Sequence, residues 1–268
     1  MDTLILCGGF ATRLEPITLF VPKPLLPVGG KPILDHIIEN VGRQNPEKIV
    51  LSTNRKFSGQ FRHWMHGWST RKLGPSIGLV VEPTMSHGEK FGAIKGINYA
   101  IEHAGLDDDL LVIAGDNYFS FDLGMLISTY LKTRKPTIAV YDIKSYDEAK
   151  RFGVVELDGD MIRSFEEKPE KPKSMFVSTG IYILPKETLH RFAEYVNDGN
   201  NPDAPGYFLQ WLINKETIHA VAYAEEWYDI GTLATYKEVF NRYLPAGTEA
   251  YKTYERAYAV EAERISPD

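Results

Sequence analysis

The sequence contains little cysteine and no long hydrophobic run. The single cysteine, Cys7, cannot form an internal disulfide or a cysteine-rich zinc site, so nothing in the 268 residues points to an oxidising compartment. No apolar run approaches the roughly 20 residues that cross a bilayer. The first residues, MDTLILCGG, lack the basic region and cleavage site of a signal peptide. We therefore expect a cytoplasmic protein without a membrane partner.

An excess of basic charge is also missing. The chain has 30 basic and 36 acidic residues, a formal net charge of −6, whereas a nucleic-acid footprint requires a basic stripe. We expect no nucleic-acid partner. The contents of 43% hydrophobic and 25% charged residues are those of an ordinary globular chain. At roughly 150 residues per domain, the length allows one large domain or two small ones.

Short apolar runs alternate with helical patterns in the first half. Buried strands are expected at 3–7, 48–52, 78–81 and 110–114, and helices at 32–41 and 91–103. Strands separated by helices are typical of a parallel, doubly wound sheet. The sequence therefore predicts an α/β fold of the Rossmann-like type with a mostly parallel sheet.

The second half changes character. A hairpin is expected over 153–168, with its tight turn at Asp158-Gly159. The other expected elements are strands at 137–143, 177–184 and 219–223, helices at 186–196, 209–214, 233–243 and 251–265, and a loop at 197–205. These patterns predict an antiparallel insertion in the α/β domain. The segment 62–68, with His63 and His66, is interpreted as a surface aromatic segment, because it has no cysteine or acidic partners for a metal site.

A glycine-rich segment with two cations follows the first strand. Leu6 to Pro16 reads LCGGFATRLEP and 22–28 reads PKPLLPV. Glycines at a strand end let backbone N–H groups approach a phosphate or a base, while Arg13 and Lys23 supply charge. Gly8-Gly9 alone would favour a tight turn, but turn geometry does not explain two cations and four prolines. The segment matches neither a P-loop nor a dinucleotide fingerprint.

Several acidic residues stand where ligands bind in α/β sheets. Asp116 ends an apolar strand, and a carboxylate there suits Mg²⁺, although it could also form an Asx-turn or a helix cap. Asp229 taken alone favours a cap for the helix that starts near Thr232. Glu166-Glu167-Lys168 taken alone favours a solvated charge run. Glu82, which follows a strand, only accepts hydrogen bonds when ionised, so it does not determine which nucleotide base the protein binds.

Taken together, six motifs resemble those of the sugar-1-phosphate nucleotidylyltransferases, the pyrophosphorylases that make NDP-sugars, typified by glucose-1-phosphate thymidylyltransferase. The motifs are the segment 6–28, Gly115-Asp116-Asn117, Phe152-Gly153-Val154, Glu166 to Pro169, TGIY at 179–182 and WYDIGT at 227–232. They stand in the family's order and span about nine-tenths of the chain. Ala11 stands where many relatives have a further glycine.

The resemblance implies a nucleotidyltransferase or GT-A-like fold. It implies a nucleotidylyltransferase domain over 1–244, with a nucleotide-binding part over about 1–135 and a sugar-binding part over about 136–244, and a helical tail over 245–268. It implies the substrates nucleoside triphosphate and sugar 1-phosphate, with glucose 1-phosphate and dTTP or UTP as the first expectation and CTP open. It also implies Mg²⁺ held by Asp116 and Asp229, and a homo-oligomer.

The resemblance also assigns roles to single residues. The catalytic residues would be Arg13, Lys23, Asp116 and Lys168. The nucleotide would be bound by Leu6, Gly8, Gly9, Thr12, Arg13, Glu82, Gly88 and Asp116, and the sugar phosphate by Gly153, Glu167, Lys168, Thr179 and Gly180. Taken alone, Gly153 and Gly180 are equally well explained as strand glycines at bulges. The loop 83–94, PTMSHGEKFGAI, is about three residues longer than in many relatives and brings Glu89 and Lys90 near the expected nucleotide site.

Two alternatives from other functional classes stay open. One is a subunit that senses a nucleotide sugar without catalysis, and the other is a metal-dependent glycosyltransferase that uses an NDP-sugar. A sensor would be expected to lack Arg13, Lys23 or an aspartate, and a glycosyltransferase would not need the Arg13 and Lys23 loop. The acyltransferase repeats that some family members append are missing, since the sequence has no hexapeptide repeat.

Overall fold

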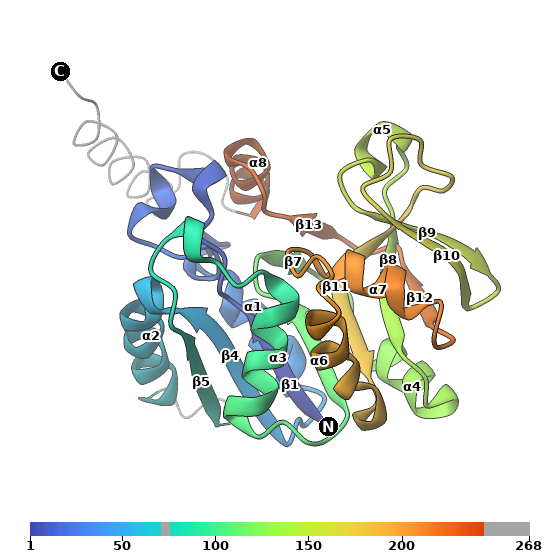
Figure 1. Ribbon diagram of the computed structural model, residues 1–268. Helices are drawn as coiled ribbons and strands as arrows, with labels where there is room; N and C mark the ends of the chain where they lie inside the picture. The colour runs from blue at the N-terminus through green and yellow to red at the C-terminus, as the bar shows by residue number, and fades with distance from the viewer. Residues whose placement is uncertain (71–75, 244–268) are drawn as a thin grey trace.

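The computed structural model describes residues 1–70 and 76–243, in which a nine-stranded sheet forms the centre (Figure 1). The strand order is β5-β4-β1-β6-β11-β8-β12-β10-β9. The strands are β1 (Asp2–Leu6), β4 (Lys48–Asn54), β5 (Ile77–Glu82), β6 (Leu110–Ala114), β8 (Thr137–Asp142), β9 (Gly153–Asp158), β10 (Met161–Glu167), β11 (Phe176–Leu184) and β12 (His219–Tyr223).

The sheet is parallel in its first half and mixed in its second. β5, β4, β1 and β6 run parallel, β11 is antiparallel to both β6 and β8, and the β9–β10 hairpin is antiparallel. The expected α/β fold with an antiparallel insertion is therefore confirmed. The hairpin turn consists of Gly159 and Asp160 instead of Asp158 and Gly159, because β9 continues through Asp158. Gly159 has φ +62°, which glycine adopts without strain.

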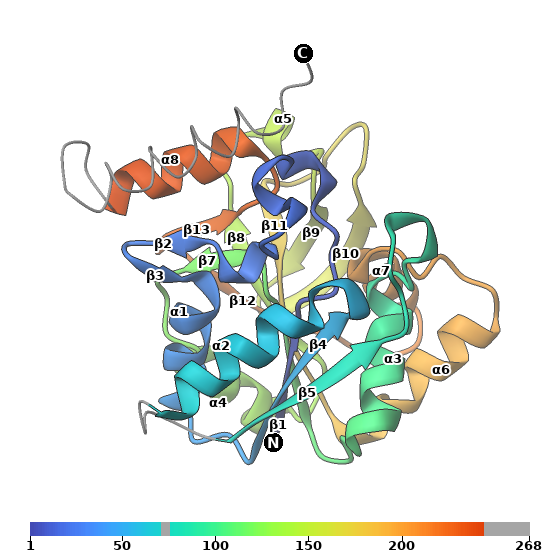
Figure 2. The same ribbon diagram turned by 90° about the vertical axis from the view of Figure 1, so that its left-hand side faces the viewer.

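Helices cover both faces of the sheet, giving three layers (Figure 2). One face carries α1 (Ile33–Gly42), α2 (Ser58–Thr70) and α4 (Gly124–Thr133), and the other carries α3 (Ala93–Ala104), α6 (His190–Asn197) and α7 (Pro205–Leu212), while α8 (Leu233–Tyr243) packs against the short strands β2 (Pro27–Val28) and β13 (Trp227–Asp229). Neighbouring residues of one strand point to opposite faces: Leu4 packs in one core and Ile5 in the other. This explains why the strands are apolar throughout.

Three helices, α2, α4 and the short α5 (Tyr146–Ala149), were not expected from the sequence. The interpretation of 62–68 as a surface aromatic segment is wrong, because the segment lies in α2, where Trp68 is buried and Trp64 Nε1 donates to Asp35 Oδ1 at 2.7 Å. His63 and His66 are exposed on this helix.

Further differences concern helix boundaries. The helix expected at 186–196 is divided into a 3₁₀ turn, η6 (Lys186–Thr188), and α6. α7 begins at Pro205, earlier than expected, because proline is favoured at the first helical position. The helix expected at 251–265 and the tail 245–268 lie outside the described residues.

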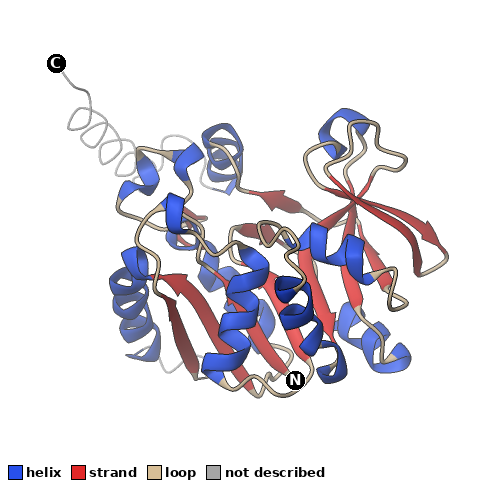
Figure 3. Cartoon of the chain, in the orientation of Figure 1, coloured by secondary structure: helices blue, strands red, loops and turns tan. Residues whose placement is uncertain are grey.

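The carboxyl ends of the parallel strands meet at one edge of the sheet, where the loops gather (Figure 3). Two small sheets lie beside this edge: β7 (Asn117–Phe119) pairs with β13 (Trp227–Asp229), and β2 (Pro27–Val28) pairs with β3 (Lys31–Pro32). A short helix, α5 (Tyr146–Ala149), precedes β9. Within 1–70 and 76–243, no helix has both the length and the apolar composition to span a membrane.

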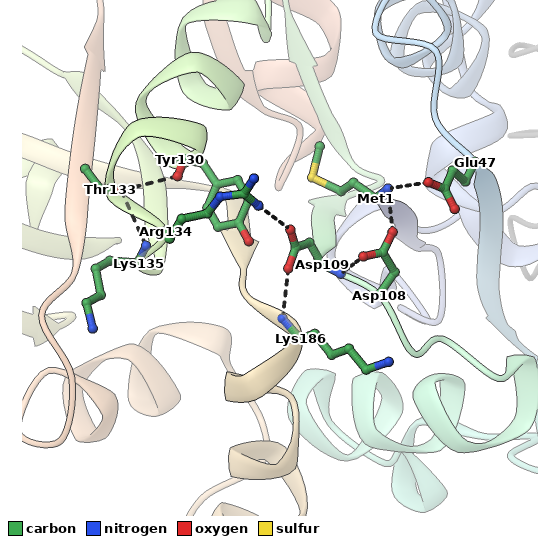
Figure 4. A network of polar contacts seen from close by, with 9 residues as sticks. All are labelled: Met1, Glu47, Asp108, Asp109, Tyr130, Thr133, Arg134, Lys135 and Lys186. Carbon is green, nitrogen blue, oxygen red and sulfur yellow. Dashed lines mark hydrogen bonds and ion pairs between the residues drawn. The ribbon is translucent and has the colours of Figure 1, made fainter.

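A polar network holds the opposite edge of the sheet, at the amino end of β6 (Figure 4). The Asp109 carboxylate accepts from the Lys186 backbone N–H at 3.1 Å and pairs with the Arg134 guanidinium at 3.2 Å. Burial, together with a hydrogen bond to Asp109, raises the pKa of Tyr130. The network ties the end of α4 and η6 to the start of β6, away from the edge where the parallel strands end.

Candidate active site

A cleft of about 410 Å³ opens at the edge where the parallel strands end. Its lining comes from segments that are far apart in the sequence: 6–13 after β1, 23–24, 90–93 before α3, and 203–205 before α7. Single residues complete it, among them Glu82, Asp116 and Lys168. This is the position at which open α/β sheets bind ligands.

The loop after β1 is held in place by its own buried residues. It contains three 3₁₀ turns, η1 (Thr12–Leu14), η2 (Ile17–Leu19) and η3 (Lys23–Leu25), and it packs Phe10 and Leu14 into the core. Thr18 Oγ1 donates to the Ala11 carbonyl at 2.7 Å, and Ala11 has φ +53°. Glycine adopts this left-handed backbone conformation more easily than alanine, so a glycine at this position would fit as well.

Lys23 and Asp116 meet across this cleft. Lys23 Nζ lies 2.9 Å from Asp116 Oδ2, with side chains 12% and 35% exposed. Asp116 lies one residue beyond the end of β6, and its carboxylate makes this ion pair instead of a helix cap. The structure therefore brings together two residues that are 93 positions apart, as the resemblance implied.

Asp229 joins this pair from β13. The β7–β13 pairing sets Asp229 opposite Asn117, and the Ile230 N–H donates to the Asp116 carbonyl at 3.2 Å. Burial and then the nearby Asp116 carboxylate raise the pKa of Asp229 to about 6, against the lowering effect of Lys23 and Arg13. Asp229 is not the cap of α8, because Thr232 Oγ1 accepts from the Thr235 N–H at that helix start.

These carboxylates form a donor set that fits a magnesium ion. Mg²⁺ binds through one or two carboxylates and completes its shell with phosphate oxygens and water. Burial, and then the neighbouring Asp116 carboxylate, raise the pKa of Asp229, which places the two carboxylates close enough to interact. Among the described residues, no cluster of three or more histidine, cysteine or acidic side chains that could hold a metal ion is found, so the protein would supply only these two carboxylates here.

Lys168 lines the same cleft from the end of β10. Its backbone N–H donates to the Phe152 carbonyl at 3.0 Å, and its φ of +49° lies in the left-handed region, where strain is common at functional sites. Glu167 has a side chain only 7% exposed, and burial raises its pKa. The interpretation of 166–168 as a solvated charge run is therefore wrong for Glu167.

Glycines make room for the Glu167 carboxylate. A Cβ at Gly206 would lie 1.7 Å from Glu167 Oε2, and one at Gly153 would lie 3.0 Å from it. Gly153 therefore lies beside this carboxylate at the start of β9. Glu167 Oε1 is 3.4 Å from Lys168 Nζ, so the two expected sugar-phosphate residues are neighbours in space.

The remaining expected residues lie around or outside the cleft. Leu6, Gly8, Gly9, Thr12 and Arg13 all line it. Thr179 and Gly180 lie behind it in a bulge of β11, where Thr179 Oγ1 donates to the Ala139 carbonyl and Gly180 has φ +76°. Gly88 lies in a 3₁₀ turn, η5 (His87–Glu89), outside the residues that line the cleft.

Sequence reasoning missed the contacts of the long loop after β5. Lys90 Nζ pairs with Asp203 Oδ1 at 2.6 Å, and the Ile94 N–H donates to the Pro202 carbonyl. Gly92 has φ +79°, and a Cβ there would lie 2.5 Å from that carbonyl oxygen. These contacts join the two halves of the chain across the cleft. The Gly-Ala-Ile at 92–94 and the polar loop before Pro205 were visible in the sequence, but no spacing linked them.

Known proteins share this sequence pattern and this architecture. The chain is 27% identical over 287 residues to a glucose-1-phosphate adenylyltransferase from Dechloromonas aromatica, covering 96% of this chain and 64% of that protein. It is 32% identical over 234 residues to the bifunctional protein GlmU from Methanocaldococcus jannaschii, covering 86% and 51%. The chain thus spans about half to two thirds of the length of these curated relatives.

Solved structures share the fold. A UDP-glucose pyrophosphorylase complexed with UDP-glucose superposes with a TM-score of 0.75 at 22% identity, over 90% of this chain and 97% of that one. The model of the family described as nucleotidyl transferase matches residues 2–245, which include every element of the cleft. The chain therefore belongs to the nucleotidyl transferase family.

Proposed function

We propose that the protein transfers a nucleoside monophosphate from a nucleoside triphosphate to a sugar 1-phosphate, giving an NDP-sugar and pyrophosphate. The observation that carries this proposal is the ion pair of Lys23 and Asp116 in a cleft that Arg13 and Lys168 also line, with Asp229 close to this pair on β13. Two polyanions need such a site, because the main costs of the reaction are charge repulsion and orientation.

The residues of the cleft have separate roles in this proposal. An oxygen of the sugar phosphate attacks the α-phosphorus, and the bond from that phosphorus to the bridging oxygen of pyrophosphate breaks on the opposite side. Lys23 stabilises charge on the α-phosphate, and Arg13 holds the departing pyrophosphate. Lys168 anchors the attacking phosphate, while Glu167 accepts hydrogen bonds from sugar hydroxyls. No covalent intermediate with the protein is required.

Asp116 and Asp229 would hold Mg²⁺, as their donor set allows. When bound, the ion would neutralise negative charge on the phosphates of the two substrates. The division into a nucleotide-binding part over about 1–135 and a sugar-binding part over about 136–244 belongs to the same proposal, as do the expected contacts of Thr179, Gly180 and Gly88. Glucose 1-phosphate is the first sugar to test, and the resemblance favours dTTP or UTP as the donor.

A matrix of nucleoside triphosphates against sugar 1-phosphates tests the proposal, with pyrophosphate release as the readout and Mg²⁺ present. We expect release only when both substrates are supplied. A sensing subunit would bind a nucleotide sugar without releasing pyrophosphate. A glycosyltransferase would consume an NDP-sugar and an acceptor, so either outcome would contradict the proposal.

A further inference from the structure

Among the described residues, three lysines line the cleft, and each of them pairs with a carboxylate. Lys23 and Lys168 are the two that the proposed reaction uses. The third is Lys90, in the long loop between β5 and α3, whose Nζ lies 2.6 Å from Asp203 Oδ1 in the loop before α7. The Lys90 ammonium group therefore reaches the same cleft, and the proposed reaction gives it no role.

The backbone on both sides of Lys90 is held by contacts other than this ion pair. On one side, the Glu89 carboxylate accepts from the Met85 N–H at 2.8 Å. On the other, the Phe91 ring packs edge-on against Tyr99 of α3, with 5.5 Å between the ring centres. The Lys90 side chain thus extends from a loop whose position does not depend on Asp203.

The loop that carries Asp203 is also held by its backbone. The Ile94 N–H donates to the Pro202 carbonyl at 3.0 Å, and the Ala93 N–H donates to the Asp203 carbonyl at 3.3 Å. These bonds satisfy N–H groups in the first turn of α3, which have no partner inside the helix. The two loops would stay joined without the ion pair, so their joining does not explain why a lysine stands at position 90.

The ion pair itself is easily exchanged. The Lys90 and Asp203 side chains are 41% and 52% exposed, and ion pairs in contact with water contribute little to stability. A phosphate group carries more negative charge than a carboxylate and offers more acceptor oxygens. The cleft needs further positive charge when it binds two polyanions, because Glu82 and Asp116 already line it with carboxylates. Exchange of Asp203 for a phosphate is therefore favourable for Lys90.

We propose that Lys90 is a further phosphate-binding residue of the cleft. In the protein without substrate, Asp203 holds the ammonium group at the cleft. When substrate binds, Nζ donates to a phosphate oxygen in place of the Asp203 carboxylate, and no proton is transferred. The role of Lys90 in turnover rests on the proposed function. The phosphate comes from the nucleoside triphosphate or from the sugar 1-phosphate, which the binding experiment below distinguishes.

The variant Lys90→Met gives the first test, because methionine keeps an unbranched side chain and removes the charge. We expect kcat/KM to fall by about tenfold or more, the range of one hydrogen bond between charged groups. Lys132→Met is the matched control, since Lys132 is an exposed lysine of α4 outside the residues that line the cleft, and it should keep the wild-type value. A wild-type kcat/KM in Lys90→Met would overturn the proposal.

The variant Asp203→Asn separates substrate binding from a structural role of the ion pair. Asparagine keeps the shape of the side chain and removes the charge that competes with phosphate for Lys90. We expect kcat/KM at least equal to that of the wild type. An ion pair that only holds the two loops together would make Lys90→Met and Asp203→Asn lose activity alike, and equal losses would overturn the proposal.

Titration calorimetry with inorganic triphosphate and with glucose 1-phosphate tests binding without turnover. Binding weakened by Lys90→Met for inorganic triphosphate alone would assign Lys90 to the nucleotide phosphates, and for glucose 1-phosphate alone to the sugar phosphate. Unchanged binding of both would overturn the proposal.

The same titrations keep this inference separate from the proposed function. Phosphate binding that depends on Lys90, without pyrophosphate release from any substrate pair, would refute the proposed reaction and leave Lys90 as a phosphate ligand. Pyrophosphate release by Lys90→Met with wild-type kinetics would support the reaction and overturn the role of Lys90.

Discussion

Replacing Asp229 by asparagine should stabilise the metal-free protein while removing its activity. Asp229 lies beside Asp116, and burial together with that neighbour raises its pKa from 3.8 to about 6. At pH 8 the folded protein therefore holds a carboxylate that would be more stable in the unfolded chain. Asparagine keeps the shape of the side chain and removes the charge.

The size of the effect follows from the pKa. Each pKa unit corresponds to about 1.4 kcal/mol, so a pKa of about 6 in place of 3.8 corresponds to at most about 3 kcal/mol. Solvent screening reduces this value, and we expect a gain of about 2 kcal/mol in the free energy of unfolding. Because the folded-state pKa is raised, the wild type loses this stability as the pH rises from about 4 to about 6. The advantage of the variant should therefore be complete above about pH 6 and disappear below about pH 4.

Urea denaturation in the presence of a chelator, at pH 4 and pH 8, measures the difference. In saturating Mg²⁺ the order should reverse, since an ion that binds only the folded state adds stability to the wild type. Asp116→Asn is the informative comparison, because it removes the repulsion and breaks the Lys23 ion pair as well. A variant Asp229→Asn that is less stable than the wild type at pH 8 without metal would refute the reasoning.

Two further predictions concern stability alone. Ala11→Gly should raise the free energy of unfolding by about 0.5–1 kcal/mol. The backbone at φ +53° costs alanine about 1–2 kcal/mol, and glycine avoids this cost but loses more conformational entropy on folding. A lower urea midpoint than that of the wild type would contradict this prediction. Asp109→Asn should lower the free energy of unfolding by about 1 kcal/mol, since it removes the charge that pairs with Arg134. It should leave kcat/KM unchanged, because Asp109 lies at the edge of the sheet opposite the cleft. A loss of activity in Asp109→Asn at a temperature where it is fully folded would contradict that separation.

Much of the fold could be predicted from hydrophobic patterning. The strands at 110–114 and 219–223 and the helix at 233–243 have the expected boundaries, because each is a strongly patterned segment between polar residues. α2 and α4 were missed because both helices interrupt their apolar positions with glycine, serine and threonine, and α2 also with histidine, so that no clear helical period appears in the sequence. The short β13 was missed because its pairing with β7 depends on contact between segments more than 100 residues apart.

The features of the site likewise divide into those that the sequence indicated and those that it did not. The convergence of Lys23 and Asp116 was indicated by motif order alone, since no periodicity relates residues so far apart. The left-handed backbone of Ala11 and Lys168 and the crossing of 90–94 by 202–203 depend on tertiary packing. Local sequence carries no signal for such contacts.

The most direct measurement is pyrophosphate release by Lys23→Met, compared with the wild type at saturating Mg²⁺ and substrates. Lys23 is the cation that contacts Asp116, and loss of one preorganised charge costs on the order of 3 kcal/mol, or about 100-fold in kcat. The account predicts that loss in a variant that remains folded by circular dichroism. Turnover equal to that of the wild type would show that the Lys23, Asp116 and Asp229 cluster does not perform the reaction.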